Sequence, residues 1–498
     1  FRHMLFQIYL YNHLDIIEKT RLHGVVGDEL EKRYRDHLTQ FPEMAHTLAR
    51  HFELAQVTDK AVQYYTQAGK NAMRFSAHRE AIQHFYRALD LLLSLPPSPQ
   101  RDKVELDLQL NLGPPLTALK GWGPPELERA YNRAQALIEH SDDTLQIIPA
   151  LWLLATFRIG RSEHAKVDRL VDRLFRLAQQ SQDPALITIA YFQASPFYQG
   201  RFKEARVLLE RAAASQDINQ QRFLAHRFGL APAAMALIYL SNCLWLMGFP
   251  QQAEVASDQA FEMAKIVGHP MTTCYVTSRA CWMGVLKGNL EQVQDHAHQL
   301  NQVAARYGFK NFEFAALFFM NWVKFMHHED SDQAIEAMNN VIEAYYATKT
   351  VLNRTAFLVY FAQVCLAADE YRRGLDRVDE SITLGEKTGE LWFQAEAWRT
   401  KGEILLVRDE EDQANELDVS EAQTCFETAF QIAHKQGAKA FELRAAISLA
   451  RLWQTQKRTA EAYQRLAEVY SWFTEGFLTT DLQEAQKLLE SLQQNLAL

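Results

Sequence analysis

The sequence predicts an all-α protein in which helix pairs stack into a right-handed superhelix, an α-solenoid. The first observation is a helix signature that returns about every 40 residues: a small or apolar residue followed by others four and seven places on. Its clearest copies begin at Ala205, Ala422 and Ala462. The second observation is a composition rich in Ala, Leu, Gln and Glu, with only 20 Gly and 14 Pro, which favours helix. In such arrays each helix pair buries its apolar face only against its neighbours.

Eight copies of the signature occur, at intervals of 40, 48, 40, 41, 40, 48 and 40 residues. They begin at Ala165, Ala205, Ala253, Val293, Ala334, Gly374, Ala422 and Ala462. The two longer intervals require insertions of about eight residues, which we place at 213–232 and in the acidic stretch 408–420, expected to be a surface loop. Helices are expected to end near Gly268, Gly308 and Gly389.

Four segments follow in chain order. Residues 1–40 lack the repeat and predict two amphipathic helices that trail a preceding module. Residues 41–110 predict an N-terminal sub-array, because small residues flank Tyr65 and Phe85 at the spacing of tetratricopeptide helices. Residues 111–478 predict the main solenoid, and residues 479–498 a helix that caps it.

Two proline-rich breaks interrupt the pattern, one at 95–99 and one that runs from 113–115 through 121–125. Proline lacks an N–H donor and disfavours helix in the residue before it. We therefore expect helices to end at both breaks and the solenoid axis to bend near 95–125.

Composition narrows the classes of function. A net charge of −9 argues against a nucleic-acid surface, which needs Lys and Arg to neutralise phosphates. Five Cys without a CxxC pair predict buried free thiols in a reducing compartment. The most apolar run, Ala233–Met247, is too short for a membrane span. We expect a cytoplasmic protein with no membrane or nucleic-acid partner.

Motifs of the common catalytic sites are missing from the sequence. It contains no GxxxxGK[ST], GxGxxG, HExxH or GxSxG. We expect this chain not to be an enzyme and to hold no catalytic residue, cofactor or metal of its own. His327, His328, Glu329 and Asp330 resemble a metal cluster, but adjacent residues on a helix point about 100° apart, and we expect a helix-end turn there.

The candidate binding residues are aromatic, Arg and Asn side chains on the first helices of the repeats. In tetratricopeptide arrays these helices line the concave face, where such side chains could hold a protein, peptide or small ligand; the competing interpretation is that each belongs to the core. The residues are Tyr191, Arg279, Trp282, Asn321, Trp322, Arg354, Tyr360, Trp398 and Arg399.

Several stretches together resemble the C-terminal region of bacterial signalling proteins that join a class III adenylate or guanylate cyclase, a STAND-type AAA-like ATPase and tetratricopeptide repeats. The matching stretches are Phe1–Leu5 with Tyr11 and Leu14, Lys120–Tyr131 (KGWGPPELERAY), Leu244–Pro250, Gln436–Ala445, Ser448–Trp453 and Tyr470–Phe477. The resemblance covers nearly the whole chain, and its motifs are structural.

This resemblance implies that residues 1–40 trail a winged-helix module and that the ATPase and cyclase would precede Phe1. ATP or ADP and Mg²⁺ are then expected for that ATPase and not for this chain. His3 matches the position of a winged-helix His that can contact the β-phosphate of ADP; the alternative is a packed helix residue. One departure is Ala231–Pro232, where the family tends to have Asp-Pro.

The leading hypothesis is a regulatory sensor and scaffold, which binds a protein or small ligand in its groove and controls an attached ATPase and cyclase. A constitutive protein-interaction scaffold is the second. The third is the sensor arm of a DNA-binding regulator, whose basic helix-turn-helix would have to lie outside this chain.

Overall fold

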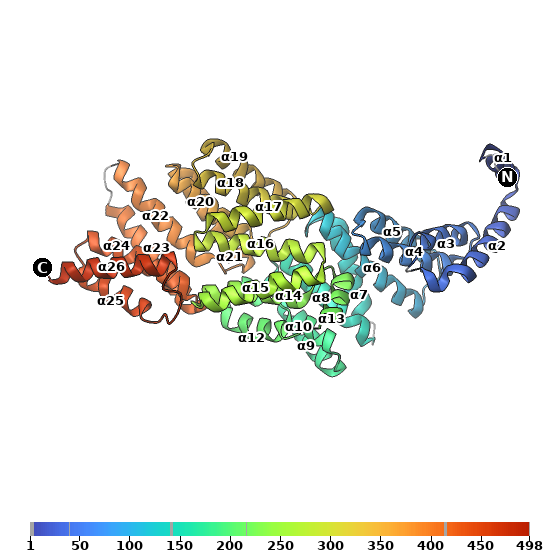
Figure 1. Cartoon of the computed structure of the whole chain (residues 1–498), viewed down its shortest axis with the longest axis horizontal. Helices are drawn as coiled ribbons and strands as arrows, with labels where there is room; N and C mark the ends of the chain where they lie inside the picture. The colour runs from blue at the N-terminus through green and yellow to red at the C-terminus, as the bar shows by residue number, and fades with distance from the viewer. Residues whose placement is uncertain (1–3, 39, 140–142, 216, 413–415, 498) are drawn as a thin grey trace. The chain divides into compact units, whose positions relative to one another are not determined.

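The structure is a computed structural model that describes residues 4–38, 40–139, 143–215, 217–412 and 416–497 (Figure 1). These residues form helices and connecting turns, and no strand occurs among them. Most consecutive helices pack side by side, and alternate helices also touch, as α14 does with α16 and α20 with α22. The predicted all-α solenoid is confirmed.

The chain divides into two compact units. The first (unit 1) comprises residues 1–120 and 124–150, and the second (unit 2) residues 121–123 and 151–498. The segment boundaries that the sequence predicts at 40, 110 and 478 stay a prediction.

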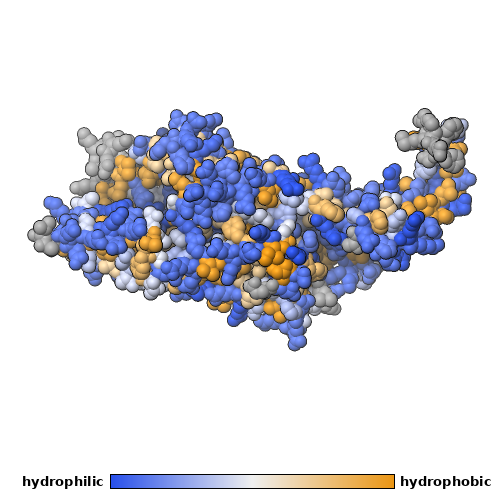
Figure 2. Space-filling model, in the orientation of Figure 1, coloured by the Kyte–Doolittle hydropathy of each residue, from blue (hydrophilic) through white to orange (hydrophobic). Residues whose placement is uncertain are grey.

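Unit 1 contains seven helices among its described residues and the first part of an eighth. They are α1 (Met4–His13), α2 (Ile16–Tyr34), α3 (Glu43–Leu54), α4 (Thr58–Arg74), α5 (His78–Leu93), α6 (Pro99–Lys120), α7 (Pro125–Glu139) and the start of α8 (Thr144–Gly160), with a short 3₁₀ turn η1 (Arg35–His37). The two helices predicted within residues 1–40 are present. Large apolar residues of α1 and α2 are exposed, Ile16 and Ile17 the most, and Figure 2 shows hydrophobic side chains along this end of unit 1.

Unit 2 continues the array with short connections. Its helices are η2 (His164–Lys166), α9 (Val167–Ser181), α10 (Pro184–Tyr191), α11 (Ser195–Tyr198), α12 (Phe202–Ala213), α13 (Ile218–Phe228), α14 (Pro232–Leu246), α15 (Pro250–Val267), α16 (Pro270–Lys287), α17 (Leu290–Tyr307), α18 (Lys310–Met326), α19 (Ser331–Ala347), α20 (Arg354–Ala367), α21 (Tyr371–Thr388), α22 (Gln394–Asp412), α23 (Glu416–Gln436), α24 (Lys439–Thr455), α25 (Thr459–Tyr470) and α26 (Thr480–Ala497).

The predicted helix ends at three glycines are confirmed. Gly268, Gly308 and Gly389 follow α15, α17 and α21 with φ of +70°, +72° and +78°. This left-handed conformation costs a glycine little because it has no Cβ. The next helix can then turn back against the one before it.

Two of the sequence predictions are wrong. Helix α6 does not end at 113–115 but continues through Pro114 and Pro115 to Lys120. Its leucines on both sides of the prolines are buried, so packing outweighs the lost hydrogen bond. The described residues of the stretch 408–420 are helical and do not form the predicted loop, since α22 reaches Asp412 and α23 begins at Glu416; residues 413–415 lie outside the described residues. The Glu and Leu residues in the described part of this stretch are good helix formers. The break at 95–99 and the second part of the other break, 121–125, do separate helices.

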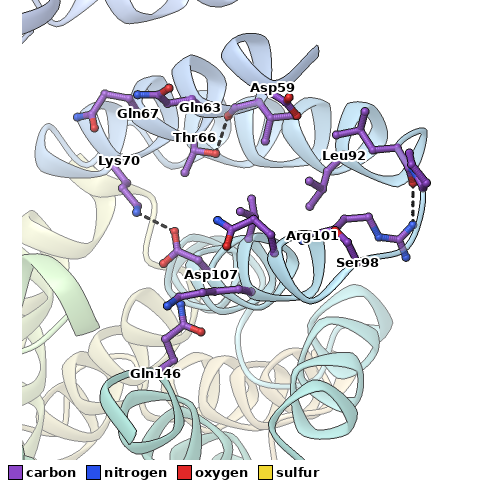
Figure 3. Close-up of a pocket in the computed structure, with 16 residues that line it drawn as sticks. Asp59, Gln63, Thr66, Gln67, Lys70, Leu92, Ser98, Arg101, Asp107 and Gln146 are labelled. Carbon is purple, nitrogen blue, oxygen red and sulfur yellow. Dashed lines mark hydrogen bonds and ion pairs between the residues drawn. The ribbon is translucent and has the colours of Figure 1, made fainter. Parts of the chain in front are cut away.

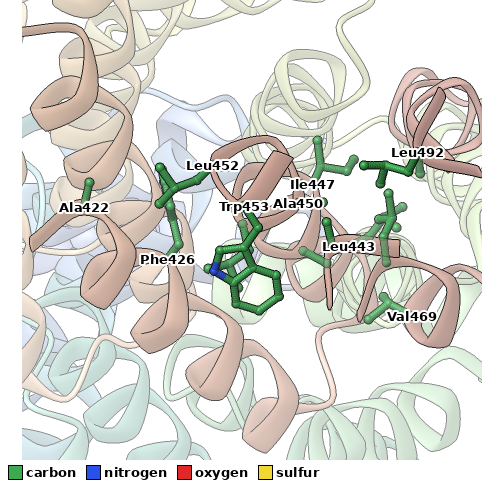
Figure 4. Close-up of a cluster of buried hydrophobic side chains, with 14 of the residues drawn as sticks. Ala422, Phe426, Leu443, Ile447, Ala450, Leu452, Trp453, Val469 and Leu492 are labelled. Atoms are coloured by element: carbon green, nitrogen blue, oxygen red, sulfur yellow. The ribbon is translucent and has the colours of Figure 1, made fainter. Parts of the chain in front are cut away.

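The C-terminal end of unit 2 shows how the repeats pack. Ala422 and Ala462, two of the predicted anchors, are fully buried in one cluster with Phe426 and Trp453. Figure 4 shows Ala422, Phe426 and Trp453 of this cluster. Leu482 and Leu492 of α26 belong to the same cluster. The described cysteines are buried and free, and burial raises the pKa of each thiol, Cys425 to about 11.

In the described part of the chain, no single helix combines the length and apolarity needed to cross a bilayer. Helices α13 and α14 meet that test only as a pair bent by 93°.

Close helix approach in unit 1 requires a glycine at position 69. A Cβ there would lie 2.4 Å from Cε1 of Phe85, whose ring is fully buried. We expect Gly69→Ala to lower the free energy of unfolding by about 1–3 kcal/mol, the usual cost of overpacking a core. Urea unfolding followed by circular dichroism measures it.

Gly24→Ala is the matched control, because its Cβ would make an ordinary contact, 3.7 Å from Cβ of Ala55. Removing a helical glycine should stabilise unit 1 by about 0.5–1 kcal/mol. Equal effects of the two substitutions would contradict the packing argument.

Candidate functional site

A groove of about 800 Å³ lies in unit 1, chiefly between α4 and α6 (Figure 3). The end of α5, the loop after it and one residue of α8 complete its wall. Its lining residues are Asp59, Val62, Gln63, Thr66, Gln67, Lys70, Leu92, Leu95, Pro96, Ser98, Gln100, Arg101, Lys103, Val104, Asp107 and Gln146. This volume is that of a typical ligand site.

Four of the polar side chains that line this groove are uncharged amides. Gln63 and Gln100 are exposed, Gln146 is half-buried, and none of the three side chains bonds to another described residue. Gln67 is already engaged, because its Nε2 donates to Oδ1 of Asn71 at 2.9 Å. A glutamine amide has two N–H donors and one oxygen acceptor. The three free amides can therefore donate to the C=O groups of a peptide backbone and accept from its N–H groups.

The charged groups of the groove are mostly paired with one another or with nearby residues. Lys70 Nζ lies 2.8 Å from Oδ2 of Asp107, and this ion pair links α4 to α6. Lys103 Nζ lies 2.7 Å from Oδ2 of Asp143. Arg101 donates from Nη1 to the Leu95 carbonyl at 2.9 Å. The pairs are partly exposed and therefore contribute little stability, but they leave no strong net charge in the groove.

Helix α4 is held in place by a buried carboxylate of α2. Glu31 accepts hydrogen bonds from the Tyr64 hydroxyl at 2.7 Å and from Lys60 Nζ at 2.8 Å, and it pairs with Arg35 at 3.0 Å. Burial by itself would raise the pKa of Glu31, but the bonds from Lys60, Tyr64 and Arg35 lower it to about 2. The carboxylate is thus ionised at neutral pH and fixes one wall of the groove.

Three of the residues predicted to bind a ligand lie together in the interior of unit 2. Trp282 stacks on Tyr360, with 5.4 Å between the ring centroids, and both are buried. Arg279 and Trp282 each contact the ring of Trp392. They meet because unit 2 closes on itself: the amides of Leu391 and Trp392 both donate to the Tyr198 carbonyl, at 2.7 and 3.0 Å.

The other six predicted residues are dispersed among separate partners. Tyr191 contacts Phe175 and Arg211, and the half-buried Asn321 donates a hydrogen bond to the Leu317 carbonyl of its own helix. Trp322 is buried, and Trp398 packs against the hydrophobic cluster at the C-terminal end of unit 2. Arg354 forms an ion pair with Glu380 and lies over the Tyr346 ring, and Arg399 donates two hydrogen bonds to Glu396. Their predicted role in binding stays a prediction.

The remaining candidate positions are at turns or outside the described residues. His3 lies outside them. The stretch 327–330 forms the predicted turn between α18 and α19, where His328 and Asp330 have positive φ. Among the described residues no three His, Cys, Asp or Glu side chains gather as a metal site would require.

The sequence analysis did not single out the glutamines of the groove. Gln63 and Gln67 are four residues apart on α4, interleaved with the small and aromatic residues that bury its other face. This polar stripe is a signal in the sequence, but solvated helix faces commonly carry glutamine, so it does not distinguish a groove from ordinary surface.

The interior position of Trp282 leads to a stability prediction. We expect Trp282→Ala to lower the free energy of unfolding by about 3–5 kcal/mol, because it removes a buried ring from a packed aromatic cluster. Asn321→Ala, at a half-buried position nearby in the array, should change it by less than about 0.5 kcal/mol. Urea unfolding of the whole chain measures both, and an unaltered midpoint for Trp282→Ala would show that this ring is free to bind a ligand.

The Glu31 carboxylate leads to a prediction about pH. Because its folded-state pKa is below the unfolded value, its contribution to stability is complete at neutral pH and is lost as pH falls through the interval from 4.5 to about 2. Glu31→Gln should therefore cost about 1–3 kcal/mol at pH 7 and progressively less in acid.

Glu29→Gln is the control on the same helix, since Glu29 is exposed and pairs only loosely with Lys32 at 3.7 Å. Unfolding midpoints measured between pH 7 and 3 should separate the two variants. A pH-independent difference between Glu31→Gln and the unmodified chain would contradict this assignment.

The chain matches no protein-family profile. An uncharacterised protein of Rhizobium meliloti (strain 1021) is 23% identical over 461 residues, which make up 91% of this chain and 43% of that protein. This chain thus spans less than half the length of that relative.

Among solved structures, the APC/C hetero-tetramer Cut9-Hcn1 resembles this chain with a TM-score of 0.52 and 12% identity, over 90% of this chain and 75% of that one. A STAND protein with a tetratricopeptide repeat sensor from Pyrococcus horikoshii gives a TM-score of 0.37 and 12% identity, over 90% and 74%. The first likeness supports the fold alone, and the second is too distant to support more. The chain is a tetratricopeptide-like helical array.

Proposed function

We propose that this chain is a recognition module that binds an extended segment of a partner protein in the groove of unit 1. The observation that carries the proposal is the groove of about 800 Å³, in which Gln63, Gln100 and Gln146 have amides without a partner among the described residues. An extended peptide presents N–H and C=O groups at regular intervals, and these amides can bond both.

The walls of the groove suit a polar peptide with scattered apolar side chains. Val62, Leu92 and Val104 provide apolar surface beside the amides. The nearly balanced charges favour neither a strongly acidic nor a strongly basic segment. Since the groove is built on packed helices, one of which is held in place by the buried Glu31–Tyr64 contact, little ordering free energy is lost on binding.

We further propose that peptide binding regulates an effector in a longer protein. The greater length of the Rhizobium meliloti relative and the resemblance to proteins with a STAND-type ATPase and a nucleotide cyclase support this role. A bound peptide can shift such an effector only by its differential affinity for two conformations of the array. A constitutive scaffold would bind the same peptide without such a shift. Hydrogen exchange of the chain with and without peptide distinguishes the two, because only the regulatory role predicts altered protection beyond the groove.

A random 12-residue peptide library displayed on phage and selected on this chain tests the proposed binding. For an enriched peptide we expect Gln63→Ala and Gln100→Ala each to weaken binding about 2- to 10-fold, the cost of one hydrogen bond. Fluorescence polarisation with the labelled peptide measures the dissociation constant. Both positions are exposed, so neither substitution should alter stability by more than about 0.5 kcal/mol.

Gln83→Ala is the matched control, an exposed glutamine of α5 outside the groove lining. Its dissociation constant should equal that of the unmodified chain. Gln63→Trp should block binding by filling the groove. If no peptide is enriched, or if Gln63→Ala and Gln83→Ala behave alike, the groove is not the binding site.

A further inference from the structure

Arg279 of α16 places a cation in the interior of unit 2. The residue is 2% exposed, and its guanidinium carbon lies 4.9, 4.8 and 5.1 Å from the ring centroids of Phe197, Tyr239 and Trp392. These rings come from α11, α14 and the segment before α22. Attraction to the ring faces offsets only part of the cost of removing a cation from water.

The polar partners of Arg279 leave part of its donor capacity unused. Nε donates to Oδ1 of Asn242 at 2.7 Å, and Nη1 donates to Oδ1 of Asn353 at 3.4 Å. Nη2 is buried and has no acceptor within the described residues, and the same holds for Nδ2 of Asn242. Two unpartnered N–H donor groups therefore belong to side chains that are hydrogen-bonded to each other.

No described carboxylate lies within 4 Å of the Arg279 guanidinium. The buried Glu390 is linked to it through Asn353, whose backbone N–H donates to Oε1 at 3.0 Å. The Glu390 oxygens already accept from the hydroxyls of Ser162 and Thr355, both at 2.7 Å. Burial raises the pKa of Glu390, against the effect of those bonds, and so weakens it further as a counter-ion.

Buried charges in proteins are normally paired, and buried donors are normally bonded. A water molecule could accept from both donors but would leave the charge uncompensated. A phosphate would bring more charge and more acceptor oxygens than these two donor groups can match. A monovalent carboxylate has one charge and two oxygens, one for each donor group.

We propose that Arg279 and Asn242 form an internal site for one small carboxylate anion, of the size of formate or acetate, which accepts hydrogen bonds from Arg279 Nη2 and Asn242 Nδ2. Because the site is buried, exchange with solvent requires local opening of unit 2 and is slow. The anion should therefore remain bound during purification.

Asn242→Asp tests this site without removing its cation. The substitution keeps the shape of the side chain, replaces the unpartnered Nδ2 by an oxygen and supplies the counter-ion from within the chain. Protein purified from formate- and acetate-containing buffer, then desalted and denatured, should release one carboxylate per unmodified chain by ion chromatography and none per Asn242→Asp chain.

Thermal unfolding gives a second readout that does not depend on retention. Sodium formate should raise the Tm of the unmodified chain above its value in sodium chloride of equal ionic strength, and this excess should vanish in Asn242→Asp. In formate-free chloride, Asn242→Asp should be the more stable chain. No released carboxylate together with equal formate effects on both chains would mean that water alone occupies these donors, and would overturn the proposal.

Discussion

Close approach of helices at small residues is the constraint on which this structure depends. Ala205, Ala422 and Ala462 have no exposed surface, and each lets a neighbouring helix pack directly against its own backbone. At Gly69 even a methyl group would collide with Phe85. Each helix pair can bury its apolar face only against the next pair. A larger residue at one of these positions would therefore push two helix pairs apart, and would not only displace individual side chains. The regular spacing of small residues in the sequence is a consequence of this constraint.

Unit 2 adds a second constraint, because its array closes on itself. The Tyr198 carbonyl accepts two backbone bonds from Leu391 and Trp392, and Ser162 bonds Glu390. These contacts join segments more than 190 residues apart in the chain. Aromatic rings such as Trp282 and Tyr360 consequently fill the interior that an open solenoid would leave as a groove. In unit 1 the space between α4 and α6 remains open, and there the polar side chains of the two helices face a groove.

This difference explains what the sequence could and could not predict. The fold follows from the period, since small residues four and seven places apart describe one face of a helix irrespective of the rest of the chain. The surroundings of Trp282 cannot be predicted from this period. The same face of the first helix would be exposed to solvent in an open array, whereas in a closed array it packs against Trp392. Local rules also failed at Pro114 and Pro115, where buried leucines on both sides keep α6 continuous. Gln63 and Gln67 were predictable as a polar stripe but not as the wall of a groove.

The two units differ in how their charged side chains are paired, and this difference affects what each unit can bind. In unit 1, Lys70 and Asp107 neutralise each other at the edge of the groove, so an uncharged backbone can enter without separating a buried ion pair. Recognition then rests on neutral amides, each contributing about 1 kcal/mol, which favours moderate affinity and tolerance of different side chains. In unit 2, Arg279 has aromatic faces and amide oxygens around it but no direct counter-ion among the described residues. A buried cation of this kind is costly until an anion reaches it. The groove of unit 1 therefore suits reversible binding of a peptide, whereas the interior of unit 2 suits long retention of a small anion.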